Sequence, residues 1–167
     1  IEGISGLMFV ATYLAIGLAD PTRLLFTIIL LECFLALAVI DLQHYIIPDG
    51  LLVFMLGVTL ASGNHHLYSA LIAGGCFFAI WAISKGKWMG FGDVKLAALL
   101  GLLFGFPGTL LVIYGAVLVG GTVGAGMVLF RKATMKTALP FGTILAASAI
   151  LYGIYSPQIL QFIAPYL

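Results

Sequence analysis

Two aspartates that border apolar stretches of the sequence could carry out hydrolysis. Asp41 follows the apolar run Thr22–Ile40, and Asp93 opens the apolar run Asp93–Phe106. Acidic residues at the edge of such runs are costly, so each is a candidate functional residue. Aspartyl hydrolysis needs two carboxyl groups that share one proton around a water molecule, one acting as base and the other as acid. We therefore interpret Asp41 and Asp93 as a candidate catalytic pair.

The expected helix ends suggest different roles for the two aspartates. Asp41 should lie at a helix C-terminus, where the helix dipole disfavours the ionised carboxylate. Asp93 should lie at a helix N-terminus with Lys95 two residues later, and both features favour its ionised form. The resulting hypothesis makes Asp93 the base and Asp41 the protonated partner. The structural alternatives are that Asp41 reaches toward headgroup water and that Asp93 is a helix N-cap.

Other residues near these aspartates could shape the same site. Asp49 follows Pro48 and precedes an apolar run, so we interpret it as the N-cap of that helix. Gly90 and Gly92, just before Asp93, permit tight backbone geometry and the close approach of another segment. These residues and Lys95 are predicted to support the site rather than to react.

The remaining acidic and histidine residues offer weaker alternatives. Glu32 lies nine residues before Asp41 and faces roughly the opposite side of the same helix, so we interpret it as a hydrogen-bonded packing residue. His44 is within reach of Asp41 and could take part in a metal site. There is, however, no His-Glu-x-x-His pattern, and we predict neither a metal nor another cofactor.

The composition indicates a membrane protein. Of the 167 residues, 63% are hydrophobic and 8% are charged, compared with about 25% charged residues in ordinary soluble domains. At about 20 residues per crossing, this length accommodates roughly seven crossings and leaves no room for a soluble domain. We expect one domain over 1–167. The net charge of +1 gives no electrostatic reason to expect a nucleic-acid partner.

Apolar runs separated by short polar breaks predict an all-α, polytopic transmembrane bundle of about six to eight spans. Two of the runs, Asp49–Ala61 and Asp93–Phe106, are too short for a full crossing, and we expect them beside a cytoplasm-facing cavity. The predicted segments are Ile1–Ala19, Thr22–Ile40, Asp49–Ala61, Leu67–Ser84, Asp93–Phe106, Gly108–Phe130 and Pro140–Tyr155.

Basic residues orient the predicted bundle. All but Arg23 fall in or beside the loops that follow Leu67–Ser84 and Gly108–Phe130, and cytoplasmic loops of membrane proteins are enriched in such residues. The clustered residues are Lys85, Lys87, Lys95, Arg131, Lys132 and Lys136. This places Asp41 and Asp93 together on the cytoplasmic side. The cations are also expected to attract anionic membrane lipid.

Two ordered motifs resemble those of the type IV prepilin peptidases, a family of GxGD-type membrane aspartyl peptidases. The first is DLQHYIIPD at Asp41–Asp49, an aspartate followed after six residues by Pro-Asp. The second is GFGDVK at Gly90–Lys95. Pro140-Phe141-Gly142 resembles a further family element, although Thr143 stands where a second proline is common. The resemblance covers essentially the whole chain.

The resemblance implies an endopeptidase of the bacterial inner membrane that removes the short basic leader of a prepilin or pseudopilin at the cytoplasmic face. Asp41 and Asp93 are the catalytic pair that it implies. The substrate's apolar helix would lie against the lipid-facing side of the bundle, with the cleaved junction beside the aspartates. The zinc-binding methyltransferase domain at the N-terminus of longer relatives is expected to be absent.

Two other functions are compatible with membrane aspartates. A small proton- or cation-coupled transporter would place its acids near the bilayer midplane, whereas Asp41 and Asp93 are expected near the cytoplasmic edge. A presenilin-like GxGD protease that cuts within the bilayer is the other alternative, and the Asp-x6-Pro-Asp element favours the prepilin branch. Flux through proteoliposomes, compared with cleavage of a prepilin-like peptide, would separate transport from proteolysis.

Overall fold

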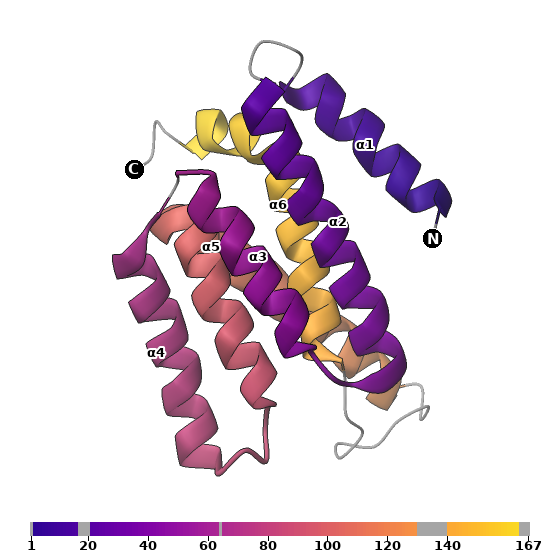
Figure 1. The fold of residues 1–167 in the computed structure, drawn as a ribbon. Coiled ribbons are helices and arrows are strands. Elements are labelled where there is room, and N and C mark those ends of the chain that lie inside the picture. Colours follow the sequence, from indigo (N-terminus) through magenta and orange to yellow (C-terminus); the bar gives the residue numbers. More distant parts are fainter. Residues whose placement is uncertain (1, 17–20, 64, 130–139, 164–167) are drawn as a thin grey trace.

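The computed structural model describes residues 2–16, 21–63, 65–129 and 140–163, and these residues form six α-helices (Figure 1). No strand occurs among these described residues, so the predicted all-α class is confirmed. The helices are α1 (Glu2–Ile16), α2 (Pro21–His44), α3 (Asp49–Ala61), α4 (Leu67–Ser84), α5 (Phe91–Leu129) and α6 (Phe141–Ile163).

Three of the helices are long and apolar enough to cross a membrane, namely α2, α4 and α5. Helices α1 and α3 are shorter, and so is the apolar stretch Phe141–Ser156 of α6. The bounds of α3 and α4 agree with the predicted runs. The number of crossings, six to eight, stays a prediction.

Helix α2 extends further than predicted. The expected run ended at Ile40, but the helix continues to His44 and places Asp41 in its last turn. The helix ends where Tyr45 adopts a left-handed conformation, with φ of 55°. The Tyr45 N–H donates to the carbonyl oxygen of Asp41 at 2.8 Å, a common way to close a helix C-terminus.

Helix α5 contains a kink close to the predicted break. We expected two segments divided at Pro107, and the structure instead bends at Gly105, where φ is 70°. Pro107 fits just after the bend because the first turn of a helix does not need its N–H. The Thr109 hydroxyl lies 2.6 Å from the Gly105 carbonyl oxygen and 3.1 Å from that of Leu100, so it hydrogen-bonds to carbonyls at the bend.

Helices α2 to α6 all contribute to the main core. Phe34 and Leu37 of α2, Met55 of α3, Leu100 of α5 and Leu145 of α6 are fully buried in it. Helix α4 packs closely on α5 because small residues face each other: a Cβ added to Gly101 would lie only 2.5 Å from the Ser69 carbonyl oxygen. Helix α1 packs on α2 and α6.

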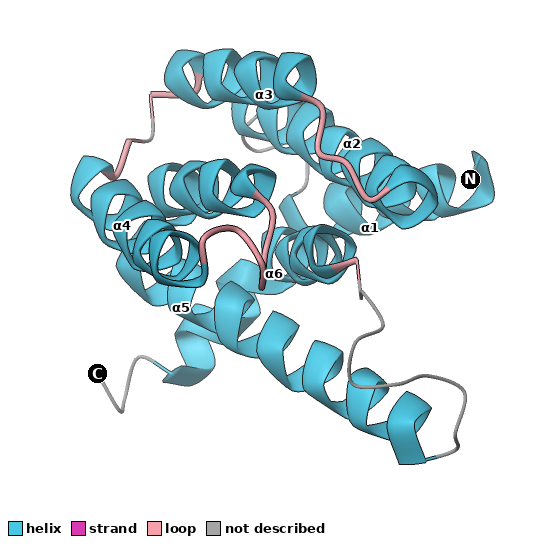
Figure 2. Cartoon of the chain, turned by 90° about the horizontal axis from the view of Figure 1, so that it is seen from below, coloured by secondary structure: helices cyan, strands magenta, loops and turns pink. Residues whose placement is uncertain are grey.

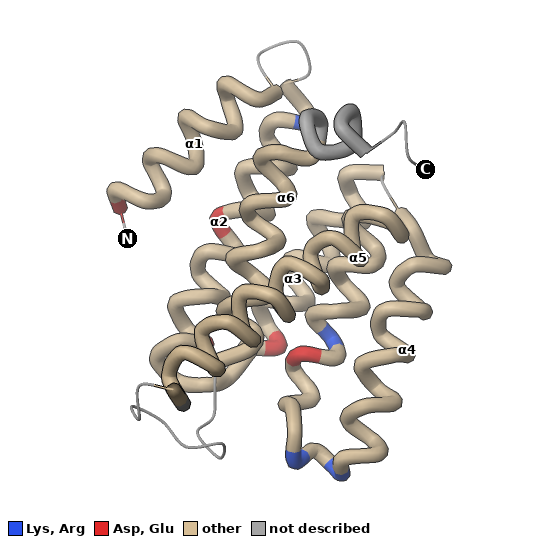
Figure 3. Tube along the Cα trace, turned by 180° about the vertical axis from the view of Figure 1, so that it is seen from behind, with Lys and Arg blue, Asp and Glu red and all other residues tan. Residues whose placement is uncertain are grey.

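The helix ends nearest the predicted motifs meet at one end of the bundle. Figure 1 shows the end of α2, the start of α3, the end of α4 and the start of α5 at the bottom of the view. Figure 3 shows that Lys and Arg positions gather at this end, with one at the opposite end. Figure 2, drawn from this end, shows the first half of α5 lying between α4 and the pair α2 and α3. The fold therefore positions several loops around one shared site.

Candidate active site

A cleft of about 1010 Å³ opens at this end of the bundle. It is bounded by the loop between α2 and α3, by the loop between α4 and α5, and by the start of α6. Six of the predicted site residues line it, namely Asp41, Asp49, Gly90, Gly92, Asp93 and Lys95. Pro48, the seventh, immediately precedes α3 beside the cleft. Two motifs distant in the sequence thus meet in one cavity.

Asp41 is held by the N-terminus of α6. Its carboxyl oxygen Oδ2 accepts a hydrogen bond from the Thr143 N–H at 2.6 Å and another from the Thr143 hydroxyl at 2.9 Å. The N–H groups in the first turn of a helix have no partner within that helix. Asp41 therefore satisfies one such donor of α6 from the last turn of α2. The Asp41 side chain is buried, with 5% of its surface exposed.

Asp93 is held by its own helix terminus. It is the third residue of α5, and its Oδ2 accepts a hydrogen bond from the Gly90 N–H at 3.2 Å. The Asp93 N–H in turn donates to the Gly90 carbonyl oxygen at 3.2 Å. The first contact is one half of a capping box, in which the third helical residue reaches back to the N–H at the capping position; Gly90 has no side chain to make the other half. Asp93 thus caps α5 from inside the helix, not from the N-cap position that we had considered.

The two carboxyl groups share one environment. Asp93 is buried, with 8% of its surface exposed, and it interacts electrostatically with Asp41. Both line the same open cleft. Two buried carboxyl groups that interact electrostatically cannot both ionise easily, so sharing one proton is favoured. This arrangement can hold a water molecule between a base and an acid.

Ile47 packs between the start of α5, which carries Asp93, and the start of α6, which contacts Asp41. A Cβ added to Gly92 would lie 2.9 Å from the Ile47 Cβ, and one added to Gly142 would lie 2.9 Å from the Ile47 Cδ1. The Gly142 Cβ would also approach Oδ2 of Asp41 to 3.0 Å. Both glycines are therefore needed for space. Gly90 differs, because an added Cβ would make only ordinary contact, 3.7 Å from Oδ2 of Asp93.

Asp49 and Lys95 form an ion pair at the edge of the cleft. The Lys95 Nζ lies 2.6 Å from Oδ1 of Asp49, and it also lies 5.2 Å from the centre of the Phe91 ring. One expectation is corrected here. Asp49 is the first helical residue of α3 and makes no side-chain cap, since the capping position belongs to Pro48. The partner of Lys95 is Asp49, and the pair connects α3 with α5.

Comparison with known proteins identifies the family to which the chain is similar. The type IV leader peptidase family matches residues 25–125, which include both Asp41 and Asp93. The chain belongs to this family. The matched region also contains the Asp49–Lys95 pair, whereas Gly142 and Thr143 lie beyond it.

Several members of the type IV leader peptidase family align with most of the chain. A prepilin leader peptidase/N-methyltransferase of Bacillus subtilis is 28% identical over 96% of this chain and 67% of its own length. The proteins of that name from Xanthomonas campestris and Pseudomonas aeruginosa are 34% and 32% identical, over 72% and 71% of this chain. The chain covers 47% and 46% of the lengths of these two relatives. No solved structure matches the chain significantly.

The other candidate residues of this family member lie away from the aspartate pair. Glu32 accepts a hydrogen bond from the Ser5 hydroxyl at 2.8 Å, so its interpretation as a hydrogen-bonded packing residue is confirmed. His44 is exposed at the end of α2 and does not line the cleft. In the part of the chain that the structure describes, no three His, Cys, Asp or Glu residues come together as potential metal ligands.

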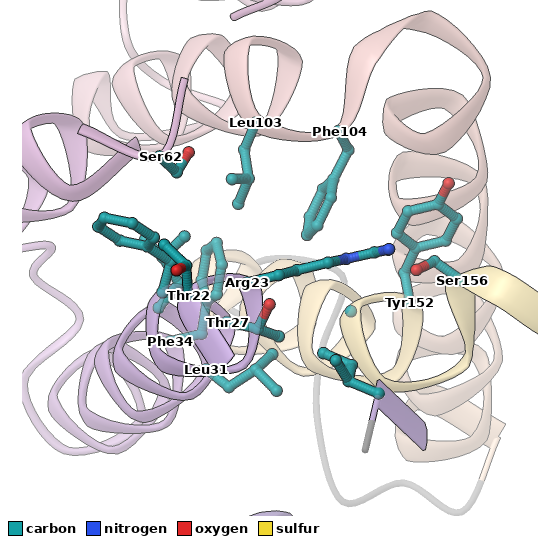
Figure 4. A pocket seen from close by; sticks show the side chains of 14 residues that line it. Thr22, Arg23, Thr27, Leu31, Phe34, Ser62, Leu103, Phe104, Tyr152 and Ser156 are labelled. Carbon is teal, nitrogen blue, oxygen red and sulfur yellow. The ribbon is translucent and has the colours of Figure 1, made fainter. Parts of the chain in front are cut away.

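A second cavity, of about 640 Å³, lies at the opposite end of the bundle. Figure 4 shows Arg23 extending into it from the start of α2 toward Tyr152 and Ser156. Its described lining side chains carry hydroxyl and apolar groups in addition to this guanidinium, with no carboxyl or imidazole group. It therefore contains no pair of acidic side chains among its described lining residues.

Sequence reasoning missed the roles of Thr143 and Ile47. We had noted Thr143 only as a departure from a common proline, yet its N–H and hydroxyl both bind Asp41. Proline has neither an N–H nor a hydroxyl group, so threonine at this position supplies two contacts to Asp41 that proline could not make. The available signal was the position of Thr143 just after Pro140-Phe141-Gly142 at the start of an apolar run. Ile47 carried no signal, because only the fold brings it against Gly92 and Gly142.

Proposed function

We propose that this chain is a membrane aspartyl endopeptidase that removes the short basic leader of a prepilin or pseudopilin. The observation that carries the proposal is the meeting of two buried carboxyl groups, Asp41 and Asp93, in one open cleft. The proposal is supported by membership of the type IV leader peptidase family and by the name, prepilin leader peptidase, that the relatives bear.

In the proposed reaction, the aspartate pair shares one proton and binds a water molecule. The ionised carboxylate takes a proton from the water while its oxygen bonds to the scissile carbonyl carbon. The protonated carboxyl group hydrogen-bonds to the carbonyl oxygen and polarises it. A proton is then delivered to the leaving amine nitrogen, and the C–N bond breaks. The assignment of the shared proton to Asp41 before the reaction stays a prediction.

Neighbouring groups fix the positions of the two aspartates for this chemistry. The two donors of Thr143 hold Oδ2 of Asp41, and the Gly90 N–H holds Oδ2 of Asp93. All three contacts involve the start of a helix, which is a rigid support. Pre-positioned groups accelerate a reaction because little ordering remains to be done at the transition state.

We further propose that the cleft faces the cytoplasm in a bacterial inner membrane. Lys85 and Lys87 follow α4 at the cleft end, and Lys95 lies in the first turns of α5, whereas Arg23 begins α2 at the other end. This distribution fits the enrichment of basic residues in cytoplasmic loops, and the cations would also attract anionic lipid. The predicted contribution of Arg131, Lys132 and Lys136 lies outside the described residues.

Incubation of the purified chain with a leader-bearing prepilin tests this function. Mass measurement of the product should give one cut at the leader junction and the addition of one water across the cleaved bond. A chain that leaves the prepilin intact under these conditions, but catalyses proton or cation flux in proteoliposomes, would contradict the proposal and favour the transporter alternative.

A further inference from the structure

An apolar groove lies between α3 and α4 and adjoins the aspartate cleft. Helices α3 and α4 follow one another in the sequence, yet within the described residues they make no helix-to-helix contact, and each packs on α5. The space between them has a volume of about 510 Å³. Figure 1 shows α3 and α4 on either side of the first half of α5.

The walls and the floor of the groove differ in exposure. The floor is formed by Leu99 and Leu102 of α5, which are buried. The walls include Val53 of α3 and Leu67 of α4, each 68% exposed. The groove therefore opens sideways, and a segment that is already in the bilayer could enter it without crossing a polar surface.

The polar groups of the groove lie at its end nearest the aspartates. Asp49 and Lys95 line both the groove and the cleft that contains Asp41 and Asp93, so the two spaces adjoin at this ion pair. From Lys95 to Leu102 the floor extends for seven residues, which corresponds to about 10 Å of helix at about 1.5 Å per residue. This length accommodates about two turns of a docked helix.

We infer that this α3–α4 groove docks the apolar segment of the substrate that adjoins the cleaved bond. The inference rests on the proposed function, because it requires a substrate with an apolar helix next to its leader. An apolar helix laid between α3 and α4 would bury its side chains against Leu99 and Leu102. Its polar end would emerge beside Asp49 and Lys95, with the scissile bond in the cleft. A lipid acyl chain is the competing occupant.

Filling the groove should impair cleavage only for substrates that carry the apolar segment. The test compares Val53→Trp with Phe54→Trp, since Phe54 is also exposed on α3, at 54%, but does not line the groove. The two substrates are a prepilin with its leader and apolar segment, and a short peptide that spans only the leader junction. For Val53→Trp we expect kcat/KM to fall about tenfold on the prepilin, equivalent to about 1.4 kcal/mol, with little change on the peptide.

The control and a second variant separate docking from misfolding. Phe54→Trp should cut both substrates like the parent chain. Leu67→Trp, which fills the groove from the opposite wall, should reproduce the selective loss of Val53→Trp. Equal losses on both substrates would mean that the cleft is distorted, and full activity of both groove variants on the prepilin would mean that the groove is not used. Either result overturns the inference.

Photocrosslinking provides an independent readout. A photoreactive residue at position 53 should capture the apolar segment of the prepilin, and one at position 54 should not. Capture of lipid alone at position 53 would overturn the docking inference while leaving the peptidase proposal intact. Failure of the parent chain to cut the prepilin would instead overturn the proposed function, and the docking inference with it.

Discussion

Thr143 donates two hydrogen bonds to a single oxygen of Asp41, one from its N–H at 2.6 Å and one from its hydroxyl at 2.9 Å. The two residues are 102 positions apart in the sequence. The contact joins the last turn of α2 to the first turn of α6, and it sets where one carboxyl group of the proposed catalytic pair lies. The same hydroxyl is also 3.1 Å from the Ala38 carbonyl oxygen, so α2 holds it at two points.

Replacement of Thr143 by valine should lower kcat without a matching change in KM. Valine keeps the N–H and the approximate shape but removes the hydroxyl donor. An ordinary hydrogen bond contributes about 0.5–1.5 kcal/mol, so we expect a fall in kcat of about 2- to 10-fold. Steady-state cleavage of the leader-junction peptide measures it. Thr143→Ser should recover most of the activity, and equal impairment of the serine and valine variants would contradict this role.

Replacement of Gly92 by alanine should impair the site more than the same change at Gly90. The added Cβ at position 92 would lie 2.9 Å from the Ile47 Cβ, whereas the one at position 90 would make only ordinary contact. Overpacking of this kind typically costs about 1–3 kcal/mol. Cleavage rates and thermal unfolding in detergent should both show the difference. The geometry would be refuted by a Gly90→Ala variant that is as impaired as Gly92→Ala.

Replacement of Asp49 by asparagine should leave most of the cleavage activity. Asp49 is exposed at the edge of the cleft, and its ion pair with Lys95 is also partly exposed, so the pair should contribute about 0–1 kcal/mol to stability. A double-mutant cycle with Lys95→Met measures the coupling energy, which should shrink at high salt. Loss of activity in Asp49→Asn as complete as that expected for Asp41 or Asp93 would make Asp49 a member of the catalytic set.

Replacement of Gly105 by alanine should destabilise the fold. Gly105 has a φ of 70° at the kink of α5, and an added Cβ would lie 3.2 Å from the His66 ring. With ψ of −179°, this backbone conformation is essentially restricted to glycine, and it costs another residue about 1–3 kcal/mol. The midpoint of thermal unfolding should fall accordingly. Gly57→Ala, at a helical position with open space around it, is the control and should show no such fall.

Much of the fold could be predicted because membrane helices leave a strong local signal. The bounds of α3 and α4 follow from apolar runs that end at polar turns, and both agree with the structure. The predicted end of α2 and the predicted position of the break in α5 were wrong, because both depend on more than the local apolar pattern. Helix α2 ends at His44 and not at Ile40, and Asp41 in its last turn contacts Thr143 of another helix, which the local sequence does not reveal. The bend in α5 lies at Gly105 because glycine, not the nearby proline, can adopt the positive φ.

The site could be predicted in its members but not in its contacts. The spacing of Asp41 and Asp93 within recognisable motifs was sufficient to pair them, and the structure places both in one cleft. The role of Asp49 was predicted wrongly because a polar residue before a helix is usually a cap, whereas here its side chain pairs with Lys95 and connects α3 with α5. Pairings between distant segments depend on how helices pack, and one sequence does not specify them.

The most direct test of the central claim is the rate of prepilin cleavage by the Asp41→Asn and Asp93→Asn variants. Asparagine preserves the shape of the side chain but cannot carry or give up the shared proton. General acid–base catalysis contributes about 10²–10⁴-fold, so each single variant should lose at least about 100-fold in rate. The double variant should be no worse than either single one, because the pair acts as a unit. Leader removal near the parent rate by either single variant would contradict the account.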